Sequence, residues 1–117
     1  MGPYEVVMSR WFVVAFGFVA VGCAGPLSDG EDAFRKGWYP EAKQAFAGLE
    51  AESRSWDDAG RAEYALYRGL TLAALGDRGA AAAWLRRAKA VEDAHPGALV
   101  DDDARRLAVA RNENALP

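Results

Sequence analysis

Apolar residues recur every three or four positions over most of the chain after residue 28, with charged residues between them. This is the spacing of one face of an α-helix, because an α-helix turns once every 3.6 residues or so. We expect helices over residues 28–36, 40–52, 55–75 and 77–92, and a last helix from residue 99 or 101 to residue 112. The pattern therefore predicts an all-α fold.

Three of these helices begin with residues that suit a helix N-terminus. Ser28 is followed three positions later by Glu31, which has the form of a capping box. Ser55 followed by Asp58 also has the form of a helix start, and Asp77 is a suitable N-cap directly after a glycine. We expect these residues to satisfy the first backbone N–H groups of each helix.

The chain from residue 30 consists of two similar halves that are offset by 39 positions. Positions 39 residues apart carry small or apolar residues in both halves. Gly30, Gly37, Ala42, Phe46 and Leu49 correspond to Gly69, Gly76, Ala81, Leu85 and Ala88. The run GWYPEAKQAF at residues 37–46 resembles the tetratricopeptide repeat, a hairpin of two helices marked by a glycine, a turn and Ala-x3-Phe. The resemblance implies two such hairpins over residues 30–96 and a capping helix within residues 97–117.

The two units depart from the usual repeat in length. Their offset exceeds the family's repeat of about 34 residues by about five, which places extra residues between the hairpins. The first unit is also truncated, because Pro26 lies where a full first helix would begin. Three or more repeats are usually needed for stability, so we expect the last helix to cover the open end of the pair.

The beginning of the chain has a different pattern. Residues 11–22 (WFVVAFGFVAVG) carry no charge and lie between Arg10 and Cys23, the only cysteine. This is the layout of an export signal. A helix of this length would rise about 18 Å, short of the roughly 30 Å hydrocarbon core of a bilayer. We therefore expect residues 1–22 to be a cleaved signal peptide. Met8 is an alternative start to Met1, because it would leave Glu5 out of a region that is normally basic.

The run Ala20-Val21-Gly22-Cys23 resembles the lipobox of bacterial lipoproteins. The resemblance implies that Cys23 carries a covalent lipid, becomes the new N-terminus, and is joined to the helices by a short linker over residues 23–29. In the enterobacterial members an Asp after the cysteine retains the protein at the inner membrane. Ala24 stands there, so the expected location is the periplasmic face of the outer membrane. The alternative is that Cys23 is a small buried apolar residue.

Composition and charge limit the classes of function. Apolar residues make up 51% of the chain and charged residues 26%, which is typical of a folded domain rather than of disorder. The formal net charge is −3, so nucleic acid is not an expected partner. A single cysteine also excludes a disulfide within the chain.

The sequence contains no recognisable catalytic motif. The only histidine, His95, lies beside Pro96 in an expected turn between helices. The acidic runs at residues 57–58 and 101–103 fall at helix starts, where carboxylates stabilise a helix without any chemistry. We therefore expect a protein that is not an enzyme and that has no metal and no cofactor besides the lipid.

A binding surface is expected on the first helix of each hairpin, which lines the concave groove in the family that the chain resembles. The corresponding residues are Phe34, Arg35, Glu63, Leu66, Leu70, Ala73 and Ala74. Leu66 and Leu70 stand on one helical face and could accept an apolar anchor from a peptide. The alternative is that they fill the core of the domain.

These features predict a membrane-anchored adaptor or assembly factor that binds other proteins of the bacterial envelope. By resemblance, its context is a secretion, pilus, motility or outer-membrane assembly complex. The first alternative is an obligate structural subunit whose repeats are completed by a partner. The second is a periplasmic ligand-binding protein or enzyme, which would need a pocket with converging polar groups.

Overall fold

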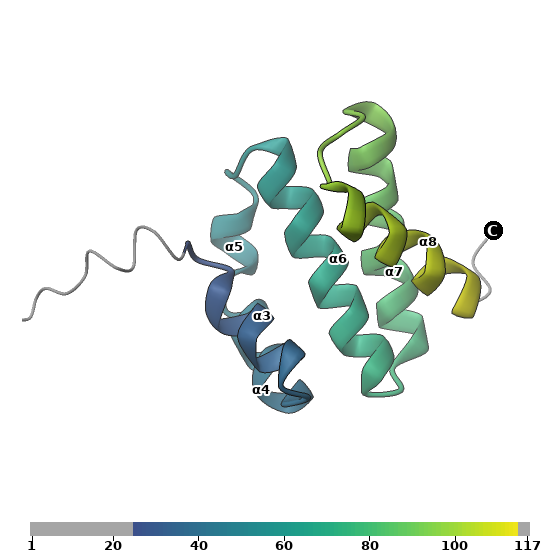
Figure 1. Ribbon diagram of the computed structural model, residues 1–117. Helices are drawn as coiled ribbons and strands as arrows, with labels where there is room; N and C mark the ends of the chain where they lie inside the picture. Colours follow the sequence, from purple (N-terminus) through teal and green to yellow (C-terminus); the bar gives the residue numbers. More distant parts are fainter. Residues whose placement is uncertain (1–24, 115–117) are drawn as a thin grey trace, which may run out of the picture.

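The computed structural model describes residues 25–114, and every regular element in this part of the chain is a helix, as the sequence predicted (Figure 1). The elements are α3 (Ser28–Arg35), α4 (Tyr39–Ala47), α5 (Glu50–Ser53), α6 (Asp58–Ala74), α7 (Arg78–Ala94) and α8 (Asp101–Glu113). The expected signal peptide and Cys23 lie outside the described residues.

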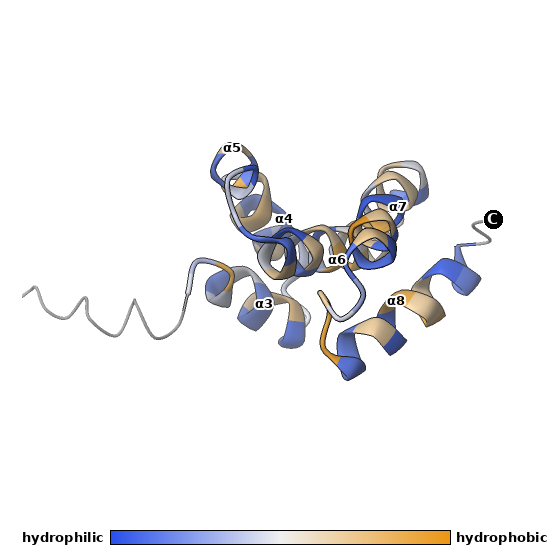
Figure 2. Cartoon of the chain, turned by 90° about the horizontal axis from the view of Figure 1, so that it is seen from above, coloured by the Kyte–Doolittle hydropathy of each residue, from blue (hydrophilic) through white to orange (hydrophobic). Residues whose placement is uncertain are grey.

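Helix α6 is the centre of the fold and contacts each of the other five helices. Helices α3 and α4 form one antiparallel hairpin and α6 and α7 form a second, longer one (Figure 1). Seen from above, α3 and α8 lie on one side of α6, whereas α5 and α7 lie on the other (Figure 2). The expected truncation of the first hairpin is evident, since α3 has 8 residues and α6 has 17.

The two hairpins close with the same backbone turn at the expected offset. Gly37 and Gly76 have φ angles of +80° and +85°, in the left-handed region that glycine adopts without steric cost. At each turn two backbone N–H groups bond back to the end of the preceding helix, including Trp38 N–H to Ala33 O at 2.8 Å. This is a Schellman motif, which satisfies carbonyl groups that the helix end leaves free.

A second pair of glycines lets the helices of each hairpin pack closely. A Cβ atom on Gly30 would lie 2.5 Å from the ring of Phe46, and one on Gly69 would lie 2.8 Å from Leu85. Both of these large side chains are fully buried. The sequence repeat therefore reflects a repeated packing arrangement, in which a glycine on one helix receives a large apolar side chain from the next.

The expected single helix over residues 40–52 is instead two helices, and this prediction was wrong. Its break has a tertiary cause, because the Tyr64 hydroxyl donates a 2.6 Å hydrogen bond to the carbonyl oxygen of Phe46. That oxygen also accepts from Leu49 N–H at 3.0 Å, a tighter turn than an α-helix makes. The chain then restarts as α5, which occupies the extra residues expected between the hairpins.

Two of the three predicted capping residues were also wrong, although α3 begins at residue 28 as expected. Ser28 is not an N-cap, since α3 begins after Leu27 without a side-chain cap and Glu31 turns toward α6 instead of back along its own helix. Ser55 donates to Glu52 O at 2.9 Å and so closes α5. The cap of α6 is Asp57, which accepts from Gly60 N–H at 2.8 Å, whereas Asp77 caps α7 as expected.

The Asp57 cap leads to a prediction for α6. The substitution Asp57→Ala leaves the first N–H groups of α6 without this acceptor and should lower the free energy of unfolding by about 1 kcal/mol. Asp57→Asn, which retains an acceptor oxygen, should lose less than half as much. Urea unfolding followed by circular dichroism measures both. Equal losses of stability in the two variants would show that the negative charge of Asp57, rather than its hydrogen bond to Gly60 N–H, stabilises α6.

Helix α8 is positioned by a turn that Glu92 holds. Its two carboxylate oxygens accept from Gly97 N–H at 2.9 Å and from Leu99 N–H at 2.8 Å. These hydrogen bonds hold the pKa of Glu92 below its usual value. Leu107 and Ala110 of α8 are buried in the common core, so α8 packs against α6 and α7.

Candidate functional site

A groove lies between α3, α6 and α8, on the side where the sequence predicted binding. We call it the concave groove. It has a volume of about 370 Å³ and is lined by Phe34, Leu70, Arg105, Arg106, Val109, Ala110 and Glu113. Two of the predicted residues, Phe34 and Leu70, thus lie together in one hollow with residues of α8 that the sequence analysis did not select.

The other predicted residues do not line this groove. Leu66 is fully buried in the core, which decides between the two roles left open for it. Ala74 is exposed near the end of α6, and Ala73 is half-buried. Arg35 and Glu63 border a second hollow at the start of α3 instead. Only part of the predicted surface is therefore both accessible and concave.

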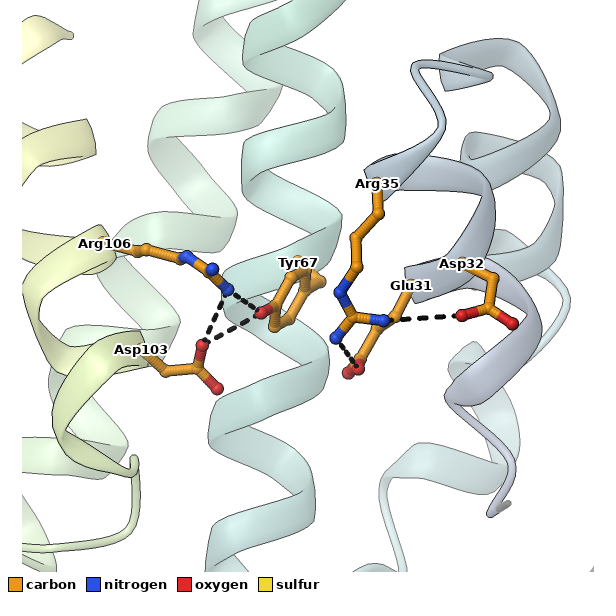
Figure 3. Close-up of polar contacts among 6 residues, drawn as sticks. All are labelled: Glu31, Asp32, Arg35, Tyr67, Asp103 and Arg106. Atoms are coloured by element: carbon orange, nitrogen blue, oxygen red, sulfur yellow. Dashed lines mark hydrogen bonds and ion pairs between the residues drawn. The ribbon is translucent and has the colours of Figure 1, made fainter.

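A polar network lies beside the concave groove and joins α6 to α8 (Figure 3). The Tyr67 hydroxyl donates to Asp103 Oδ1 at 2.9 Å, and Arg106 donates to the same hydroxyl and, at 3.3 Å, to the same carboxylate. Burial, followed by the hydrogen bond to Asp103, raises the pKa of Tyr67 to about 12. The phenol therefore remains neutral at physiological pH, and the network fixes Arg106 at the groove edge.

On the α3 side, a buried carboxyl group faces α6. Glu31 is 7% exposed, and Arg35 Nη2 lies 3.3 Å from its Oε1 atom (Figure 3). Its other oxygen, Oε2, meets no N–H or hydroxyl donor among the described residues. The Glu63 carboxyl group faces Glu31 across the helix interface and can hydrogen-bond to it only when one of the two groups carries a proton. Burial, together with Glu63, raises the pKa of Glu31 to about 8. Two carboxyl groups in contact are more stable when one of them is protonated than when both are ionised, because two negative charges repel each other.

A further cleft, which the sequence did not predict, lies on the opposite side of α6, between α5 and α7. We call it the arginine cleft. Its volume is about 290 Å³, and it is lined by the apolar and aromatic residues Tyr64, Ala65, Trp84, Ala90 and Val91 and by the polar and charged residues Glu50, Ser53, Arg54, Arg61 and Arg87. Arginines stand three or four positions from aromatic residues on α6 and α7, a spacing that was visible in the sequence. What the sequence did not show is that α5 would stand opposite α7 and close a cleft.

His95 lies in the turn after α7, as expected, but it has a partner. Its Nδ1 atom is 3.1 Å from Asp58 Oδ2 at the start of α6. Asp58 also pairs with Arg61 of the next helical turn. These exposed contacts join the start of α6 to the turn after α7. They do not include a nucleophilic side chain.

Comparisons with known proteins give no family for this chain: no family model matches it, and no curated protein or solved structure is significantly similar to it. Over residues 25–114, no three His, Cys, Asp or Glu side chains are grouped so as to hold a metal ion. In the same part of the chain, none of the helices combines the length and the apolar character that a bilayer span requires.

Proposed function

We propose that this chain is a non-catalytic adaptor or assembly factor that binds another protein of the bacterial envelope. In this proposal the lipid on Cys23 holds the domain on the periplasmic face of the outer membrane. The observation that carries the proposal is the concave groove, which combines an apolar floor with charged groups held in place. The complex that it serves is of the secretion, pilus, motility or outer-membrane assembly kind, a part of the proposal that rests on the resemblances alone.

The groove is suited to an apolar anchor from a partner protein. Val109 is 55% exposed at its edge, and Phe34 and Leu70 are half-buried within it. The ring of Phe34 is held edge-on against Tyr67, with the ring centres 5.7 Å apart. An apolar side chain that enters the groove would be removed from water. Because the groove is already ordered before binding, the entropy cost of binding is lower.

The alternative of an obligate subunit is less well supported. Such a subunit should leave a large continuous apolar face for its partner to cover. Four large hydrophobic residues of the described part of the chain are exposed, namely Trp38, Leu75, Val100 and Val109. Trp38 and Leu75 lie at the turns of the two hairpins, Val100 is the residue before α8, and Val109 is on α8, so these residues are spread over separate elements. The domain has its own closed core, which favours a protein that folds before it binds.

Cross-linking in a bacterial host tests the proposal. The full chain, tagged at its C-terminus, is compared with Cys23→Ser, Val109→Lys and the matched surface variant Val100→Lys. One or a few stoichiometric envelope proteins should be captured by the full chain and by Val100→Lys, and should be lost with Val109→Lys. Loss with Cys23→Ser supports the lipid anchor. If Val109→Lys captures the same proteins in the same amounts, the concave groove is not the binding surface.

A further inference from the structure

The Trp84 ring, which lines the arginine cleft, has two guanidinium groups close to it. The Arg68 guanidinium carbon lies 4.4 Å from the centre of the Trp84 ring, and that of Arg87 lies 4.3 Å from it. The same indole meets the ring of Tyr64 edge-on, with centres 5.5 Å apart. Arginines stacked on an aromatic ring lose little freedom on binding, and their N–H groups remain directed outward for a planar acceptor such as a carboxylate.

The charges at the cleft have the opposite sign to the charge of the whole chain. Three arginines, Arg54, Arg61 and Arg87, line it with one acid, Glu50, whereas the chain as a whole has a net charge of −3. Glu50 is already engaged, since Arg68 Nη1 lies 3.0 Å from its Oε1 atom and holds its pKa below the usual value.

Arg87 differs from the other arginines of the cleft in its partners. Arg61 is paired with Asp58, and Arg54 lies 3.6 Å from Glu50. Arg87 makes no direct ion pair with any residue from 25 to 114 and stacks on the Trp84 ring. Its charge contributes, after those of Arg68 and Arg54, to lowering the pKa of Glu50. A positive group of this kind is available to a carboxylate from another molecule.

We propose that the arginine cleft binds an acidic segment of a partner protein, with a carboxylate on Arg87 and an adjacent apolar side chain against Tyr64, Ala65 and Val91. This is a second binding surface, on the opposite side of α6 from the concave groove. It does not depend on the proposed function of that groove. The two surfaces together would let one domain hold two segments at once, which raises the effective affinity for a partner that carries both.

An acidic peptide fits the cleft better than an anionic membrane does. Three arginines line a hollow between α5 and α7, which a side chain can enter but which a flat lipid surface would bridge. The net negative charge of the chain also opposes adsorption on anionic lipid. The apolar walls and the cleft volume of about 290 Å³ suit one or two side chains of a peptide.

The test uses the full chain in a mild nonionic detergent and a short peptide of alternating Glu and Leu with blocked ends. The same peptide with Gln in place of Glu is the matched ligand control. Binding is followed by nuclear magnetic resonance through the indole N–H signal of Trp84, assigned with Trp84→Phe. We expect the Glu peptide to shift this signal in a saturable way and the Gln peptide to bind at least about tenfold more weakly.

The protein control uses two neighbouring arginines of α7. Arg87→Glu should weaken binding of the Glu peptide by about tenfold or more, whereas Arg86→Glu should change it by less than about twofold. The charge change is the same in both variants, but Arg86 is exposed and is not one of the residues that line the cleft. Circular dichroism shows whether each variant is folded.

Three results would overturn the proposal. The first is equal binding of the Glu and Gln peptides, or equal weakening by Arg86→Glu and Arg87→Glu. The second is Arg87-dependent binding to phosphatidylglycerol vesicles without binding of the peptide, which would assign the cleft to a lipid surface. The third is that the wild type sediments as a dimer and Arg87→Glu as a monomer, which would assign the cleft to a second copy of the chain.

Discussion

Replacing Gly69 with alanine is expected to lower the free energy of unfolding by about 2 kcal/mol, even though alanine is the better helix former. The new Cβ would lie 2.8 Å from two side-chain carbons of Leu85 and 3.2 Å from its backbone nitrogen. Leu85 is fully buried, so it has no free space into which to move. Overpacking of this kind costs about 1–3 kcal/mol and exceeds the gain of up to about 1 kcal/mol in helix propensity.

The matched control is Gly79→Ala in α7. A Cβ at that position meets nothing within 4 Å, so only the gain in helix propensity remains and the stability should rise by about 0.5–1 kcal/mol. Urea unfolding measures both variants. Gly30→Ala should destabilise as Gly69→Ala does, since its Cβ would lie 2.5 Å from the Phe46 ring. If Gly30→Ala or Gly69→Ala is as stable as the wild type, the glycines are not packing contacts and the repeat needs another explanation.

The parts of the fold that the sequence predicted are those set by neighbouring residues. The apolar spacing along each helix, the glycines at the hairpin ends and the Asp77 cap involve residues a few positions apart, so the sequence displays them directly. The glycines and large apolar residues that recur at one offset in the sequence make matching contacts in the two hairpins, although the helices of the first are about half as long. The lipobox and the tetratricopeptide resemblance remain predictions.

The parts that the sequence did not predict depend on residues far apart in the chain. The break between α4 and α5 requires Tyr64 to reach the carbonyl of Phe46, 18 positions away. The arginine cleft requires α5 to stand opposite α7. Leu66 and Leu70 have the same chemistry and lie one helical turn apart on α6, yet Leu66 is fully buried in the core whereas Leu70 is half-buried and lines the concave groove. The spacing of apolar residues predicts which face of a helix is buried, but it does not predict which other helix packs on that face.

The substitution Glu31→Gln is expected to stabilise the protein increasingly as the pH rises from about 4.5 to about 8. In the unfolded chain Glu31 loses its proton near its usual pKa of 4.5, whereas burial and Glu63 hold the pKa in the folded state at about 8. Between these values the folded state binds more protons than the unfolded state. The contribution of this group to stability therefore falls as the pH rises, and the full loss is reached above pH 8 or so.

Glutamine removes this loss because it is neutral at every pH and its amide can donate a hydrogen bond to Glu63. Arg35, the nearest positive group, lowers the pKa of Glu31 but does not cancel the effects of burial, Glu63 and Asp103. We expect the difference in unfolding free energy between Glu31→Gln and the wild type to grow by on the order of 3 kcal/mol from pH 4.5 to pH 8.

Urea titrations at half-unit pH steps measure this difference, with Glu41→Gln, an exposed position on α4, as the control for loss of a surface charge. Taking the difference from the wild type removes the pH dependence of every other group that is unchanged. A difference that stays constant with pH would mean that Glu31 is ionised in the folded state, and the contact between α3 and α6 would then need a positive partner. Growth of the difference between pH 4.5 and pH 8 therefore indicates a shared proton at the α3–α6 interface, whereas a constant difference indicates an ionised Glu31.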